Sequence, residues 1–392
     1  MTASKTKRTI PVQQLLSPFK LERYFAQYEF HVQYTLCSSD CEAVTIHDLL
    51  ELEPDARARF EQHWLGYTES PGAPTLRAEI AKIYQTIQPE HVLVHTGAEE
   101  AIFLFMHAAL CAGDHVIVHA PCYQSLTEVA ASIGCQVSPW RAREENRWAL
   151  DVDELRGMLR PNTRVIVVNT PHNPTGWLMP RGDSSFLGTS FLRVNEIARE
   201  RNIILFSDEV YRESEYDAAL RLPAACDVND SAVSLGVLSK TYGLPGLRIG
   251  WIATHNTPVY ERMAALKDYT TICNGAPSEF LAELALRHRE KLAQRNLEII
   301  ARNLRLLDAF FAENANRFSW VRPQAGPIAF PKLLQGSAND FCHALVTQQG
   351  VLLLPGRLFD DDAQPMHLEN YFRIGFGRKN MPEALTRLEG FL

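Results

Sequence analysis

Short apolar runs and helix-like segments alternate through the middle of the chain. The apolar runs predict strands at His91–His95, His115–His119, Val165–Asn169, Ile203–Asp208, Ala232–Leu238 and Ile249–Ala253. Helical periodicity predicts helices at Glu99–Ala112, Gln124–Ile133 and Val194–Arg201. Strands that alternate with helices form parallel βαβ units, and nearly continuous apolar strands are typical of a sheet buried on both faces. The pattern therefore predicts an α/β fold with a mostly parallel central sheet flanked by helices.

The pattern changes after about Asp268. A long helical stretch is expected over Glu279–Glu313, and a smaller α+β segment follows it to Leu392. These changes predict three parts. Residues 1–54 form an N-terminal segment that packs on the small domain and the active site, residues 55–285 a large α/β domain, and residues 286–392 a small C-terminal α+β domain.

Composition excludes several classes of function. The net charge is −7, and such a chain has no basic excess with which to neutralise the phosphates of a nucleic acid. No run of about 18 apolar residues is present, so no membrane span is expected. The basic stretch Met1–Arg8 is expected to be a short disordered leader. Eight cysteines occur without a CxxC pair or zinc-like spacing, which favours a reducing, cytoplasmic compartment and no metal site.

Candidate chemistry gathers where the predicted strands end, which is where open α/β sheets bind ligands. Gly97, Ala98 and Glu99 follow the first strand and open a helix, whose free N–H groups suit a phosphate. Taken alone, an ordinary helix cap at Thr96 with acidic first-turn residues is the better explanation. Arg248, before the last strand, is a further candidate because its guanidinium can bind a phosphate through two hydrogen bonds.

Two further turns carry side chains that suit a flat aromatic ligand. Tyr123 follows the second strand and can stack on a ring. Asn173 lies in a rigid turn with two prolines and a glycine, and can bind a ring hydroxyl. Taken alone, the first is more often a core residue and the second part of a tight turn.

The remaining two strands end in ionisable side chains. Asp208 ends a buried strand, where a carboxylate is costly unless a cation such as a pyridinium nitrogen pairs with it. Lys240 follows an apolar strand, and desolvation together with neighbouring cations should lower its pKa, as an amine that forms a Schiff base requires. A phosphate cradle, a stacking ring, a hydroxyl partner, a carboxylate and a lysine are together the parts that bind pyridoxal 5′-phosphate (PLP).

Three motifs resemble those of the class I/II aminotransferases, PLP enzymes of fold type I. They are NTPHNPTG (Asn169–Gly176), SDEVY (Ser207–Tyr211) and SKTYGLPGLRIGW (Ser239–Trp251). The resemblance implies that Lys240 binds the cofactor and shuttles a proton. It assigns the ring nitrogen to Asp208, the ring hydroxyl to Tyr211 and Asn173, ring stacking to Tyr123, and the phosphate to Gly97, Ala98, Glu99 and Arg248. Family members often have Ser or Thr at the place of Val237, so here that phosphate contact is either lost or supplied by Ser239.

The same resemblance implies a substrate and a partner. Arg373, in the stretch Tyr371–Phe376, matches the arginine that binds the substrate α-carboxylate. Asn173 is expected to contact the substrate as well as the ring hydroxyl. Tyr67 matches a residue that reaches the phosphate of a neighbouring subunit, which implies a homodimer with shared active sites. The expected reaction moves the α-amino group of an amino acid to a 2-oxo acid by a ping-pong mechanism.

The N-terminal segment departs from the family pattern and leaves the reaction open. Where many members have a glycine-rich loop, this chain has Leu36–Glu42. The segment resembles, weakly, that of PLP enzymes acting on arginine derivatives, the capreomycidine synthase-like group, which implies elimination, cyclisation or oxidation. The carboxylates of Glu22, Glu29, Asp40 and Glu42 could face a guanidinium; a solvated amphipathic helix is the simpler interpretation. A transcription regulator is disfavoured, because too few residues precede the PLP domain for a winged-helix module.

Overall fold

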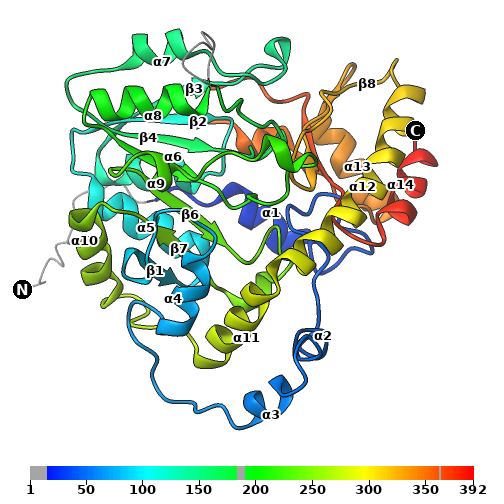
Figure 1. Cartoon of the computed structure of the whole chain (residues 1–392). Helices are drawn as coiled ribbons and strands as arrows, with labels where there is room; N and C mark the ends of the chain where they lie inside the picture. Colours follow the sequence, from blue (N-terminus) through cyan, green and yellow to red (C-terminus); the bar gives the residue numbers. More distant parts are fainter. Residues whose placement is uncertain (1–15, 183–189, 362) are drawn as a thin grey trace, which may run out of the picture.

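A seven-stranded sheet forms the centre of the computed structural model, which describes residues 16–182, 190–361 and 363–392 (Figure 1). The Met1–Arg8 leader lies outside these residues. In spatial order the strands are β1 (Val92–His95), β7 (Gly250–Ala253), β6 (Val233–Val237), β5 (Ile204–Asp208), β4 (Thr163–Asn169), β2 (His115–Ala120) and β3 (Gln136–Arg141). Only β7 runs antiparallel to its neighbours β1 and β6. The mostly parallel sheet predicted from the sequence is confirmed.

Helices cover both faces of this sheet because successive strand residues point to opposite sides. Val165 and Val167 pack with one group of helices, whereas Ile166 and Val168 pack with another. The first face carries α5 (Gly97–Ala109), α6 (Ser125–Ile133) and α10 (Thr257–Lys267). The opposite face carries α4 (Pro74–Ala81), α7 (Val152–Met158), α8 (Phe191–Glu200), α9 (Ala225–Val228) and α11 (Ala276–Arg287). This double coverage explains why the strands are apolar along their whole length.

The C-terminal elements form a second, smaller core beside the sheet (Figure 1). A three-stranded antiparallel sheet has the order β11 (Leu354–Pro355), β12 (Phe372–Gly375) and β9 (Ile328–Ala329), and β8 (Phe318–Ser319) pairs with β10 (Lys332–Leu333). The long α12 (Arg289–Glu313), α13 (Ala338–Gln349) and α14 (Met381–Glu389) pack around them. The boundaries of the three predicted parts remain a proposal.

The N-terminal segment begins with α1 (Lys20–Tyr28), which lies between the large sheet and the C-terminal elements (Figure 1). Lys20 N donates to Gln124 Oε1 before α6 (2.8 Å), and Tyr24 Oη donates to Leu353 O beside β11 (3.2 Å). The chain then passes through Leu36–Glu42 to the short helices α2 (Ile46–Leu50) and α3 (Ala56–Glu61). Residues 20–42 therefore contact both main parts of the molecule.

Two sequence-based expectations differ from the structure. The predicted helix Glu279–Glu313 is two helices, because His288 leaves the helical conformation (φ −113°, ψ 21°) between α11 and α12. Strand β3 was not predicted, since its sequence QVSPWR contains a proline and few apolar residues; Pro139 is tolerated because β3 lies at the sheet edge. Within the described ranges, no helix is both long and apolar enough to cross a membrane.

Candidate active site

Gly97 and Arg248 form a cradle at the carboxyl end of β1. Gly97 begins α5 with φ +82°, and a Cβ atom there would overlap the Arg248 guanidinium. Gly250 allows the same close approach, because a Cβ atom on it would press against the Gly97 and Ala98 backbone. The α5 N-terminus and a guanidinium thus face the same small space. Free N–H groups and an arginine fork are what a phosphate requires.

This cradle gives a first testable prediction. Gly97→Ala should weaken PLP binding at least about tenfold, because the added methyl group displaces Arg248 and a positive φ disfavours alanine. Equilibrium dialysis of the cofactor against the cofactor-free protein measures the effect. Gly113→Ala is the matched control, since Gly113 also has a positive φ (+89°) but open space around its Cβ position. Equal loss of affinity in both variants would contradict the cradle.

Asp208 ends β5 as a buried carboxylate. Its Oδ1 accepts from Val210 N (3.2 Å), and its backbone O accepts from Thr170 N and from Asn169 Nδ2 (3.1 and 3.0 Å). Burial raises the pKa of Asp208 to about 7, although its own Val210 contact and Lys240 act to lower it. A carboxyl so poorly compensated is stabilised by a nearby cation, such as a protonated ring nitrogen.

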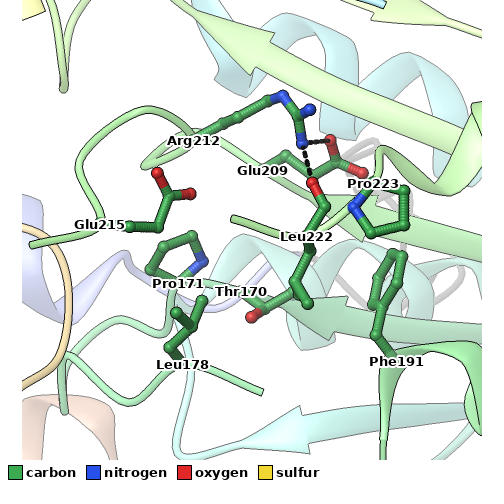
Figure 2. A pocket seen from close by; sticks show the side chains of 9 residues that line it. All are labelled: Thr170, Pro171, Leu178, Phe191, Glu209, Arg212, Glu215, Leu222 and Pro223. Atoms are coloured by element: carbon green, nitrogen blue, oxygen red, sulfur yellow. Dashed lines mark hydrogen bonds and ion pairs between the residues drawn. The ribbon is translucent and has the colours of Figure 1, made fainter. Parts of the chain in front are cut away.

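Glu209, the residue after Asp208, forms a largely buried ion pair with Arg212 (Figure 2). Arg212 Nη1 lies 3.8 Å from Glu209 Oε2 and donates to Leu222 O at 2.8 Å. Glu209 Oε1 accepts from Ala225 N and Ser234 Oγ (2.9 and 2.8 Å). The cavity beside this pair is about 10 Å³, room for at most one water. The cavity is therefore too small for a ligand, and the Glu209–Arg212 ion pair supports the turn that follows β5.

Lys240 lies beyond β6 with its amine in the interior. Nζ donates to Ser39 Oγ at 2.9 Å. Desolvation lowers the pKa of Lys240, and Arg373 acts in the same direction, whereas Asp40, Asp208 and Glu22 act against it. The direction is the one predicted from the sequence, with burial as its main cause. A lower pKa increases the fraction of neutral amine, which is the nucleophilic and basic form.

Arg373, on β12, is fully buried and faces the large sheet. Nε and Nη2 donate to Cys37 O (3.1 and 2.9 Å), and Nη1 donates to Asn173 Oδ1 (3.1 Å). The Asn173 backbone is held in turn by Asn169 Oδ1 (2.7 Å). Two residues 200 positions apart in the sequence, both predicted to bind substrate, are thus in direct contact.

The remaining predicted residues surround the same space. Tyr211 is buried and donates to Ser39 O (3.0 Å), while Tyr123 donates to Glu22 Oε1 on α1 (3.3 Å). Burial raises the pKa of Glu99, beside Tyr123, to about 7. Ser239 is buried next to Lys240.

Tyr67 is the exception, because it is 85% exposed in the single chain.

The structure adds residues that the sequence did not indicate. Ser39 contacts Lys240 and Tyr211, and Asn169 links the Asn173 turn to the Asp208 strand. Asn169 could have been noticed, since it ends a predicted strand. Ser39 could not, because no spacing rule relates it to a lysine 201 positions away.

The four carboxylates of the N-terminal segment do not form one solvated face. Glu22 is exposed, Glu29 is half-buried, and Asp40 is buried and paired with Arg378 (2.9 and 2.8 Å). Glu42 Oε2 accepts from Lys379 N (2.8 Å). Burial, with Asp40 and Glu22 as neighbours, raises the pKa of Glu29. The solvated-helix interpretation therefore holds for Glu22 but is wrong for Asp40.

The donor set fits PLP. The cradle of Gly97 and Arg248 would hold the phosphate, Asp208 the ring nitrogen, and Lys240 the aldehyde carbon. When bound, PLP supplies an electron sink for the pair released at a substrate α-carbon. The buried Asp208 carboxyl and the overlap that any side chain at Gly97 would create are the observations that support this fit.

Comparison with known proteins identifies the family of the chain. Residues 32–388 match the family described as aminotransferase class I and II. Capreomycidine synthase of Streptomyces vinaceus is 32% identical over 93% of this chain and 90% of that protein.

Two solved structures are also similar. A PLP-dependent aminotransferase of Streptococcus suis 89-1591 has a TM-score of 0.87 and 32% identity, covering 96% of this chain and 98% of the other. The PLP-dependent cyclase OrfR has a TM-score of 0.84 and 28% identity, covering 98% and 99%. The chain therefore belongs to the class I and II aminotransferase family, as a PLP-dependent enzyme of fold type I.

Proposed function

We propose that this enzyme is an aminotransferase, which moves the α-amino group of an amino acid to a 2-oxo acid in two half-reactions. The observation that carries the proposal is the convergence of Lys240, Asp208 and Arg373 beside the Gly97–Arg248 cradle. A base, a carboxylate for the cofactor ring and a carboxylate-binding arginine are the groups that transamination of an α-amino acid needs.

Each group has a separate task in this proposal. When substrate binds, Arg373 would donate to the α-carboxylate in addition to the Cys37 carbonyl or in place of it. A carboxylate is the planar partner that a guanidinium prefers. Lys240 Nζ would take the α-proton and return it to the carbon that was the aldehyde carbon of PLP. Asp208 would keep a positive charge on the ring nitrogen, so that the electron pair left at the α-carbon is stabilised.

A second candidate is elimination, cyclisation or oxidation of an arginine derivative on the same scaffold. Support comes from the similarity to capreomycidine synthase and to the cyclase OrfR. The carboxylates of Glu22 and Glu29 on and after α1 supply negative charge near Lys240, which suits a cationic substrate side chain. Both candidates begin with removal of the α-proton by Lys240.

One assay separates the two candidates. The PLP-loaded enzyme is incubated with pyruvate or 2-oxoglutarate and with glutamate, alanine, arginine or hydroxyarginine, and products are identified by mass spectrometry. We expect a 2-oxo acid from the amino donor and a new amino acid from the acceptor. Release of water or a ring-closed product from hydroxyarginine, without amination of either oxo acid, would replace the first candidate by the second.

Two further proposals concern the state of the protein. We propose a homodimer, because Trp64, Leu65 and Tyr67 are 77–85% exposed on one stretch of chain, an unusual concentration of aromatic and apolar surface. Sedimentation equilibrium giving only the monomer mass would contradict it.

We also propose a cytoplasmic location, because the eight cysteines, all described, form no disulfide. Recovery of the protein in a periplasmic or secreted fraction would contradict it.

A further inference from the structure

The segment Leu36–Glu42 is fitted closely against the end of β12. Gly375 N donates to Leu36 O (3.0 Å), and Glu42 N donates to Gly377 O (2.8 Å). Cβ atoms on Gly375 and Gly377 would overlap the carbonyl oxygens of Ser38 and Asp40. The Asp40–Arg378 ion pair fixes the same stretch from the side. Since two glycines are needed to make room for it, the segment is a built part of the fold.

This segment touches three residues of the site. Cys37 O accepts two hydrogen bonds from Arg373. Ser39 O accepts from Tyr211 Oη, and Ser39 Oγ accepts from Lys240 Nζ. The Ser39 hydroxyl is the group of this segment that meets a reacting atom.

We infer that Ser39 is a further catalytic residue: its hydroxyl holds the free Lys240 amine in the orientation in which that amine takes the α-proton from the substrate. In this step the Cα–H bond would break and an N–H bond would form on Nζ, while bound PLP would supply the sink for the electron pair left at Cα. The resulting ammonium keeps its hydrogen bond to Ser39 Oγ. The inference rests on the base role of Lys240 proposed above, and it applies to both candidate reactions.

The surroundings of Lys240 explain why such a contact matters. The charged groups that act on the amine are Asp40, Asp208, Glu22, Glu29 and Arg373. They come from four different parts of the chain, and within the described residues none of them is hydrogen-bonded or ion-paired to Nζ. A lysine side chain has four rotatable bonds, so a single well-placed acceptor decides where its amine points.

The test uses three variants. Ser39→Ala removes the hydroxyl but keeps the backbone carbonyl that binds Tyr211, and Ser39→Thr restores a hydroxyl. Ser38→Ala is the matched control, because the neighbouring Ser38 is buried but its hydroxyl donates to Thr35 O (3.4 Å) and not to the site. All three are compared with the wild type by thermal melting before use.

In the first readout, the PLP-loaded enzyme is incubated in D₂O with glutamate, alanine, arginine or hydroxyarginine. Exchange of the α-hydrogen of each amino acid is followed by mass spectrometry. We expect Ser39→Ala to slow exchange about tenfold or more, the factor that one hydrogen bond corresponds to. Ser39→Thr and Ser38→Ala should stay near the wild-type rate. A wild-type rate for Ser39→Ala, or an equal loss in Ser38→Ala, would overturn the inference.

The second readout needs no cofactor. Reductive methylation of Lys240 in the cofactor-free protein is followed against pH by peptide mass spectrometry. An acceptor for the ammonium favours the charged form, so Ser39→Ala should shift the midpoint of labelling about one pH unit lower, and Ser39→Thr should reverse it. An unchanged midpoint overturns the inference. A third outcome separates the two proposals. If the wild type exchanges the α-hydrogen of none of the four amino acids, but Ser39→Ala lowers the labelling midpoint as expected, the proposed reaction fails while the Ser39 contact stands.

Discussion

Lys240→Ala should reduce turnover by at least about 10³-fold and remove the covalent link between enzyme and PLP. The reason is that one amine performs two tasks, as the nucleophile that binds the cofactor and as the base that moves the α-proton, and each contributes about 10² or more. Turnover is measured as 2-oxo acid formation. The covalent link is measured separately, as PLP that stays on the polypeptide after borohydride reduction and denaturation. Such retention requires an amine at position 240.

Two controls separate loss of chemistry from loss of structure. Lys82→Ala removes an exposed lysine at the C-cap of α4 that pairs with Glu79 at the surface, and should retain full activity and the covalent link. Added ethylamine should restore part of the α-hydrogen exchange of Lys240→Ala, because a free amine can occupy the space of the deleted side chain. Unreduced turnover by Lys240→Ala would refute the assignment of this residue, and with it both candidate reactions.

Much of the site follows from the sequence because its parts lie where strands end. In a parallel sheet all carboxyl ends meet at one edge, so Gly97, Asn173, Asp208 and Lys240 could be placed together once their strands were recognised. Arg248 belongs to the same edge because β7 runs in the opposite direction and begins there. These are local patterns combined by one rule of topology.

The rest depends on contacts that no local pattern contains. Ser39 and Asp40 lie in a loop, and their positions are decided by Gly375, Gly377 and Arg378, more than 330 residues away. Whether a carboxylate such as Asp40 is solvated or buried depends on that distant partner. The break at His288 was missed for a different reason, since the apolar periodicity continues on both sides of it and only the backbone changes direction.

Asp208→Asn should reduce turnover about 10²-fold or more, and should also change how the stability of the cofactor-free protein varies with pH. The activity falls because an amide cannot hold the charge on the ring nitrogen that makes PLP an electron sink. The stability effect follows from the burial that raises the pKa of Asp208 to about 7, from an ordinary value of 3.8. The folded protein therefore holds a proton that the unfolded chain has already released between about pH 4 and pH 7.

The sign of the pH effect is fixed by that difference. Where the folded state binds more protons than the unfolded state, stability falls as the pH rises. Wild-type cofactor-free protein should lose up to about 4 kcal/mol from this group between pH 4 and pH 7, whereas Asp208→Asn, which has nothing to ionise there, should lose that much less. Glu99, whose pKa burial also raises to about 7, acts on Asp208, so the measured difference includes the interaction between these two carboxyls.

Urea unfolding at several pH values measures this slope, with Asp230→Asn, which changes an exposed aspartate, as the control that should match the wild type. Parallel stability curves for wild type and Asp208→Asn would mean that the carboxyl is not held protonated in the folded protein. Bound PLP should flatten the wild-type curve alone, because a cationic ring nitrogen stabilises the ionised carboxylate and the amide gains no such partner. The same buried carboxyl at the end of β5 that weakens the cofactor-free protein near neutral pH would thus favour binding of the cofactor.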